Sequence, residues 1–133
     1  MRARIRKEIT VRAEDKVGAF SQLFDIAEAA GVNIRAFHGY VLDGNAVFNI
    51  VVDSHAAAAA AFEAAGYPCE VKEVVLVSAG DRVGAAAEIA RRLAQCGVDV
   101  HASYGSGTVA MGEFQAVLHT SDCSKAADVL DNR

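Results

Sequence analysis

Two short stretches of the sequence have residue types that suit the binding of a small charged molecule. Asp15–Ala19 is Asp-Lys-Val-Gly-Ala, and Asp81–Ala85 is Asp-Arg-Val-Gly-Ala. Each stretch precedes a segment with helical spacing, so free backbone N–H groups and the positive end of the helix dipole would lie at the turn. A carboxylate is a favourable ligand for such a turn.

The residue types in these turns leave two interpretations open. Gly18 and Gly84 lack a Cβ, which lets a ligand approach the backbone but also permits tight packing of a helix on a strand. Asp15 and its counterpart Asp81 could pair with an ammonium group or could simply cap the helix. Further along the chain, the amide of Asn33 offers both donors and acceptors, so it could bind either charged group of an amino acid.

The two turns are part of an internal repeat. When the sequence is shifted by 66 residues it aligns with itself without a gap. The identical pairs include Asp15 and Asp81, Gly18 and Gly84, Gly31 and Gly97, Gly39 and Gly105, Phe48 and Phe114, and Val51 and Val117. The sequence therefore predicts a tandem duplication.

One unit of the repeat has the pattern strand, helix, strand, strand, helix, strand. A strand is expected over 5–13, and Asp15 can cap a helix that begins near Val17 and ends at Gly31 in a left-handed cap. The next expected elements are a strand at 33–42, the hairpin turn Asp43-Gly44, a strand at 45–52, a helix at 55–65 capped by Ser54, and a strand at 69–79. Phe48, Ile50 and Val52 should share one face. This order predicts an α+β fold of tandem ferredoxin-like βαββαβ units, with antiparallel sheets and helices on one face.

The second unit repeats this order but has no final strand of its own. Its expected elements are a helix over 83–96, strands over 99–106 and 110–120, and a helix over 122–130. The sheet edge of this unit should therefore stay open or be covered by something else. The glycine-rich stretch Ser103–Gly107 lacks the Lys-Ser/Thr of a phosphate loop, and we interpret it as a flexible turn at the end of a strand.

The stretches "DKVGAF…AAGVNI" and "DRVGAA…QCGVDV" resemble the signature of the ACT domain family, the small-molecule-sensing modules of amino-acid metabolism. The chain is most similar to stand-alone proteins of two ACT units, with residues 1–73 as the first unit and 74–133 as the second. The family's usual proline is replaced by Val17 and Val83, and its asparagine becomes Asp99 in the second unit. The resemblance implies a non-catalytic sensor that binds an amino acid or similar small carboxylate, commonly at an interface between units. It implies that the ligand-binding residues are Asp15, Lys16, Val17, Gly18, Ala19, Asn33 and Ile34, with the parallel set Asp81, Arg82, Val83, Gly84, Ala85, Asp99 and Val100.

Composition limits the classes of partner. The net charge of −4 argues against nucleic acid, and no apolar run is long enough for a membrane span. Arg2, Arg4 and Arg6 alternate, which fits a strand with one charged face better than a basic targeting arm. We therefore expect a cytoplasmic protein. The open sheet edges and the resemblance to the ACT family imply a homodimer that needs no cofactor, with a metabolic enzyme as a potential partner.

Alternative functions remain open at this stage. A ligand-free assembly module would use open sheet edges to join an enzyme subunit. An enzyme is disfavoured because no nucleophile or phosphate site has supporting spacing, so no catalytic residue is assigned. Cys69, Cys96 and Cys123 form no close pair, and the four histidines lie on different elements, so no metal ligand is assigned either.

Overall fold

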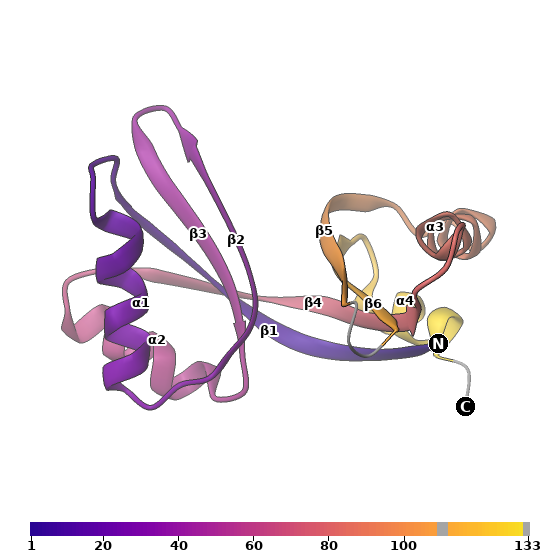
Figure 1. The fold of residues 1–133 in the computed structure, drawn as a ribbon, viewed down its shortest axis with the longest axis horizontal. Coiled ribbons are helices and arrows are strands. Elements are labelled where there is room, and N and C mark those ends of the chain that lie inside the picture. Colours follow the sequence, from indigo (N-terminus) through magenta and orange to yellow (C-terminus); the bar gives the residue numbers. More distant parts are fainter. Residues whose placement is uncertain (109–111, 132–133) are drawn as a thin grey trace. The chain divides into compact units, whose positions relative to one another are not determined.

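The computed structural model describes residues 1–108 and 112–131, which form helices and strands in the order shown in Figure 1. The elements are β1 (Arg2–Glu14), α1 (Ala19–Ala29), β2 (Ile34–Leu42), β3 (Asn45–Val52), α2 (His55–Ala64), β4 (Cys69–Gly80), α3 (Ala85–Gln95), β5 (Val100–Thr108), β6 (Glu113–Thr120) and α4 (Cys123–Leu130). None of the helices in these ranges is long and apolar enough to cross a membrane.

The chain folds into two compact units. The N-terminal unit is Lys7–Lys72, and the C-terminal unit is Met1–Arg6 together with Glu73–Arg133. Hydrogen-bonded strands follow the order β2-β3-β1-β4-β6-β5, and the long strands β1 and β4 each contribute to both units. Each unit therefore has the strand order of a ferredoxin-like sheet, which confirms the α+β fold of tandem βαββαβ units.

In the N-terminal unit, α1 and α2 pack on one face of the sheet. Ile9 pairs with Ile50 across β1 and β3, and both side chains lie in the core beneath the helices with Leu23 and Phe62. Phe48, Ile50 and Val52 share this core, as their alternation predicts. The hairpin turn is also as predicted, because Asp43 and Gly44 both have positive φ, 52° and 77°.

In the C-terminal unit, the first residues of the chain lie beside elements from its second half. Ala3 is buried in a core with Val77, Leu93 and Leu130. The Ala3 N–H donates to Asp131 Oδ1 at 3.2 Å, and Arg4 pairs with the same carboxylate at 3.2 Å. In the N-terminal unit the last strand is the start of β4, which follows α2 in the chain. In the C-terminal unit no strand follows α4 among the described residues, and Met1–Arg6 from the start of the chain takes the place of that last strand. The sequence analysis assigned residues 1–73 to the first unit and did not foresee this grouping.

The structure differs from the sequence analysis at the start of two helices and in one glycine-rich stretch. The helices begin at Ala19 and Ala85, two residues later than expected, and each has a left-handed glycine at its N-cap. Ser103–Gly107 is not a turn but lies within β5. A Cβ at Gly105 would be 2.5 Å from the Gln115 carbonyl oxygen, so this position requires glycine for close strand contact.

The ungapped alignment of the repeat is also wrong in its second half. Leu42 pairs with Asn45 across a two-residue turn, whereas Thr108 pairs with Glu113 across a loop two residues longer. Gly39 faces Phe48, and its counterpart Gly105 faces Ala116. Phe48 therefore corresponds to Ala116 and not to Phe114, and Val51 corresponds to His119 and not to Val117.

The burial of Ala3 predicts that Ala3→Asp destabilises the protein. A carboxylate at this position would be buried without a partner in an apolar core, and we expect the free energy of unfolding to fall by about 3 kcal/mol. Chemical denaturation measures this loss. Arg2→Asp places the same side chain at the exposed neighbouring position and should change the free energy by no more than about 0.5 kcal/mol. Equal effects of the two variants would contradict the burial of Met1–Arg6 in the C-terminal unit.

Candidate functional site

The turn before α1 leaves the helix N-terminus accessible. Gly18 is the N-cap residue with φ of 92°, and no side chain caps the helix. No atom lies within 4 Å of a Cβ built on Gly18, and the side chain of Val17 is fully exposed. The Asp15 N–H donates to the Gly44 carbonyl at 3.4 Å, which ties the turn to the β2–β3 hairpin. The alternative interpretation of Asp15 as a helix cap is therefore wrong.

The turn before α3 repeats this arrangement. Gly84 has φ of 89°, no side chain caps the helix, and Val83 is fully exposed. The Asp81 N–H donates to the Gly112 carbonyl at 2.8 Å. The Asp81 carboxylate lies over Gly107 of β5, where an added Cβ would be 2.8 Å from Oδ2. Asp81 therefore does not cap α3 either.

The basic residues of the two turns have different environments. Arg82 pairs with Glu88, which also accepts from Arg92 at 2.7 Å. Hydrogen bonding from Arg82, followed by that from Arg92, lowers the pKa of Glu88 below its ordinary value of 4.5. Gln22 takes the position of Glu88 in the N-terminal unit, and Lys16 makes no ion pair within residues 1–108 and 112–131. The ammonium group of Lys16 is therefore available for a ligand, whereas the Arg82 guanidinium is already paired.

The residues predicted at the start of β2 lie away from the turn. Asn33 and Ile34 line an open hollow of about 430 Å³ together with Glu28 and Gly31. This hollow is at the C-terminal end of α1, and the 11 residues of that helix span roughly 16 Å. A single unit therefore does not bring Asn33 and Ile34 together with Asp15–Ala19.

The corresponding residues of the C-terminal unit are tied to the start of α4. The Asp99 N–H donates to Ser121 Oγ at 3.0 Å, and the Asp99 carboxylate lies 3.4 Å from His101 Nε2. Val100 instead lines a separate groove against α3. Asp99 and Val100 are thus also at the opposite end of their helix from Asp81–Ala85.

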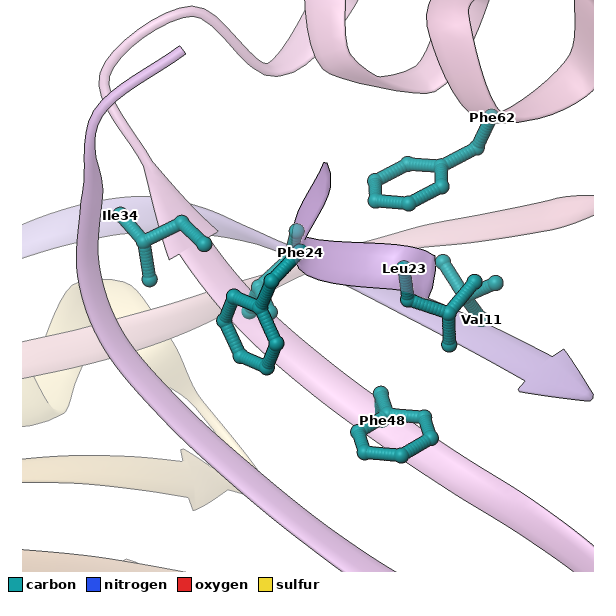
Figure 2. Close-up of a pocket in the computed structure, with 7 residues that line it drawn as sticks. Val11, Leu23, Phe24, Ile34, Phe48 and Phe62 are labelled. Atoms are coloured by element: carbon teal, nitrogen blue, oxygen red, sulfur yellow. The ribbon is translucent and has the colours of Figure 1, made fainter. Parts of the chain in front are cut away.

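Aromatic packing closes the interior of the N-terminal unit. Phe20, Phe24 and Phe37 form contacts with ring centroids 4.5 to 6.0 Å apart, and Phe48 lies 5.5 Å from Phe20. Figure 2 shows Phe24 and Phe48 beside the cavity between the helices and the sheet, where only about 10 Å³ remains. The sequence analysis missed this cluster, although Phe20 and Phe24 have the i, i+4 spacing that places two side chains together on a helix.

The C-terminal unit has an open groove in the equivalent place. It has a volume of about 270 Å³ and lies between α3 and the strands β5 and β6. The lining residues are Ala86, Ile89, Ala90, Leu93, Val100, Ser103, Tyr104, Gly105, Phe114, Ala116 and Leu118. The sequence analysis did not find this groove, because the ungapped alignment equated Phe48 with Phe114.

The cysteines are unpaired and partly buried. Burial raises the pKa of the Cys69 thiol, which favours the neutral form. Among the described residues, no three His, Cys, Asp or Glu side chains come together as a group that could hold a metal ion.

The positive φ at Gly18 and Gly84 predicts a specific stability loss on substitution. Gly18→Ala or Gly84→Ala forces a Cβ into the left-handed region and should lower the free energy of unfolding by about 1 kcal/mol. Gly80→Ala is the control, because Gly80 has ordinary φ and open space around its Cα. We expect Gly80→Ala to be neutral or slightly stabilising. Denaturant titration distinguishes the two cases, and a loss of the same size at Gly80 would disprove the backbone explanation.

The interactions of Glu88 predict a pH-dependent contribution to stability. Because the folded-state pKa of Glu88 is lowered, its contribution is present above about pH 4.5 and is lost as the pH falls through the lowered pKa. The difference in unfolding free energy between the wild type and Glu88→Gln should therefore be larger at pH 7 than at pH 3. Glu28→Gln is the matched control on α1, where the described residues provide no ion pair. A wild-type to Glu88→Gln difference that does not vary with pH would contradict the assignment.

Comparisons with known proteins agree with this architecture. No protein-family model and no curated protein matches the sequence. Among solved structures, a Bacteroides thetaiotaomicron protein, BT0572, is similar at 20% identity with a TM-score of 0.87, covering 96% of this chain and 88% of that one. The ligand-free regulatory subunit of aspartate kinase from Thermus thermophilus is similar at 14% identity with a TM-score of 0.70, covering 98% and 95%. The corresponding subunit from Thermus flavus is similar at 15% identity with a TM-score of 0.67, covering 98% and 92%.

These similarities extend over nearly the whole chain, and at this level of identity they establish the fold. They confirm the architecture that the resemblance in the two turn motifs predicted. The chain has the fold of a tandem ACT-domain protein.

Proposed function

We propose that this protein is a non-catalytic regulatory module that binds an amino acid or a similar small carboxylate in the cytoplasm. The observation that carries the proposal is the pair of matching turns. In both, a left-handed glycine precedes a helix N-terminus that no side chain caps, next to a fully exposed valine. The backbone N–H groups and helix dipole favour a carboxylate there. The regulatory subunits with this fold support the assignment by analogy.

The turn of the N-terminal unit is the stronger candidate for binding the carboxylate of the ligand. The ammonium group of Lys16 makes no ion pair with the described residues and adds a positive charge beside the open turn, whereas Arg82 is paired with Glu88. Asp15 is the group that would pair with a ligand ammonium. Val17, Gly18 and Ala19 would contact the ligand through their backbone. The equivalent set in the other unit is Asp81, Arg82, Val83, Gly84 and Ala85.

We infer that the second half of the site comes from another copy of the chain. Asn33 and Ile34 are separated from the turn of their own unit by the length of α1. Asp99 and Val100 are separated from their turn by α3. We therefore propose a homodimer. The edge strand β2 supports this, because Phe37, Val41 and Leu42 are more than half exposed there.

The same apolar edge supports a second candidate function. An assembly module that pairs with a metabolic enzyme would use β2 as an interaction edge without binding a ligand. The proteins described as regulatory subunits of aspartate kinase are a structural precedent for such pairing.

A thermal-melt panel with each of the twenty amino acids tests the two candidates. A ligand at about 100 times its dissociation constant should add roughly 2.7 kcal/mol to the free energy of unfolding. In a protein of this size the midpoint should rise by several degrees for one chemical class of amino acid. Asn33→Ala should abolish the shift because it removes both the donor and the acceptors of that side chain.

Gln115→Ala is the control, since it removes an exposed amide side chain of β6 that belongs to neither of the proposed ligand-binding sets. It should leave the ligand-induced shift unchanged. A panel with no shift for any amino acid would disprove the binding of amino acids and favour the assembly module.

A further inference from the structure

The two units differ at one set of equivalent positions on the first helix of the unit and the two strands beside it. Once the longer hairpin loop is taken into account, every ring of the N-terminal aromatic cluster is replaced by a small residue in the C-terminal unit. Phe20, Phe24, Phe37 and Phe48 correspond to Ala86, Ala90, Ser103 and Ala116. All four small residues line the groove between α3 and the strands β5 and β6.

Part of the aliphatic wall corresponds as well. Leu23, Ile34 and Ile50 border the cavity of the N-terminal unit, and Ile89, Val100 and Leu118 take their places around the groove. These three wall positions are thus retained. The N-terminal cavity, which Val11 and Phe62 also line, has a volume of about 10 Å³, and the C-terminal groove has a volume of about 270 Å³. Phe114, which has alanine as its counterpart, lines the groove without closing it.

The size of the groove suits a single aromatic ring. An apolar cavity of about 150 Å³ is large enough to hold benzene. The N-terminal unit also shows which chemical group this framework accepts, because the phenyl rings of Phe24 and Phe48 line the cavity there beside Leu23 (Figure 2). Moving such a ring from water into contact with Ile89, Leu93 and Leu118 is favourable.

We propose that the groove of the C-terminal unit binds the aromatic ring of a small molecule. The ring occupies the space that phenylalanine side chains fill in the N-terminal unit. Its flat faces contact the α3 alanines on one side and β5–β6 on the other. The hydroxyl of Ser103, where the N-terminal unit has Phe37, gives the groove a polar group for a substituent on the ring. This site does not depend on carboxylate binding at the turns.

A titration of the intact protein with 4-fluorobenzyl alcohol tests the proposal. Fluorine NMR follows the probe, and methyl NMR follows the protein. This probe has a ring but no carboxylate or ammonium, so its binding is independent of the proposed function. We expect saturable binding and chemical-shift changes at the methyl groups of Ile89 and Leu118. Ala90→Phe should weaken binding at least about tenfold, because its ring restores the side chain that closes the equivalent space.

Ser103→Phe is a second filling variant, at an exposed position that tolerates a large side chain, and it should have the same effect. Ala87→Phe is the matched control, because Ala87 is exposed on α3 but does not line the groove. It should leave the affinity within about twofold, as expected for a site without contact to the probe.

Several results would overturn the proposal. These are the absence of saturable binding, binding that survives both filling variants, and shift changes confined to the N-terminal unit. A change of oligomeric state in Ala90→Phe without any binding of the probe would also overturn it and would assign the groove to a contact between protein chains. Binding of the ring probe by a protein that shows no shift with any amino acid would support the groove while disproving the function proposed for the turns.

Discussion

The C-terminal unit depends on a contact between the two ends of the sequence. Ala3 and Asp131 are 128 positions apart, yet the backbone of one bonds to the carboxylate of the other. The contact fixes Met1–Arg6 beside the last helix and provides the unit with the segment that its own part of the repeat lacks. An edge strand left without this neighbour would expose unpaired N–H and C=O groups. Contacts over such sequence distances are slow to form, so this unit should complete its structure after the locally connected hairpins.

Local signals in the sequence predicted most of the fold. Asp43-Gly44 determined one hairpin, and Gly31 and Gly97 end their helices with φ of 70° as expected. The non-local features were not predictable in the same way. The register of β6 follows from a loop two residues longer, and no local pattern reveals which strand receives Met1–Arg6. Gly105 looked like a flexible turn because its requirement comes from Gln115 on the neighbouring strand and not from its own neighbours in sequence.

The candidate site was only partly predictable for a related reason. The turns were recognised because glycine, valine and the helix start are adjacent in sequence. Their environment was not, since the pairing of Arg82 depends on Glu88, six residues further along the chain, and Gln22 replaces that residue in the other unit. Sequence similarity between the turns therefore concealed a difference in charge. The two turns offer the same backbone to a ligand, but among the described residues Arg82 is in an ion pair and Lys16 is not.

The two units differ in how the space between their first helix and the sheet is filled. Filling a cavity is an easy route to stability, because each buried ring adds apolar area. The N-terminal unit has taken this route with Phe24 and Phe48, which line its cavity, while Phe20 and Phe37 contact Phe24 from more exposed positions. The C-terminal unit has small residues at all four positions while keeping the surrounding aliphatic wall and the strand that Gly105 holds close. Loss of one ring could be compensated by movement of its neighbours, but removal of all four leaves a volume that the fixed sheet cannot collapse. An open groove of this size lowers stability, and its most direct physical explanation is an apolar occupant that restores the lost contacts when it binds.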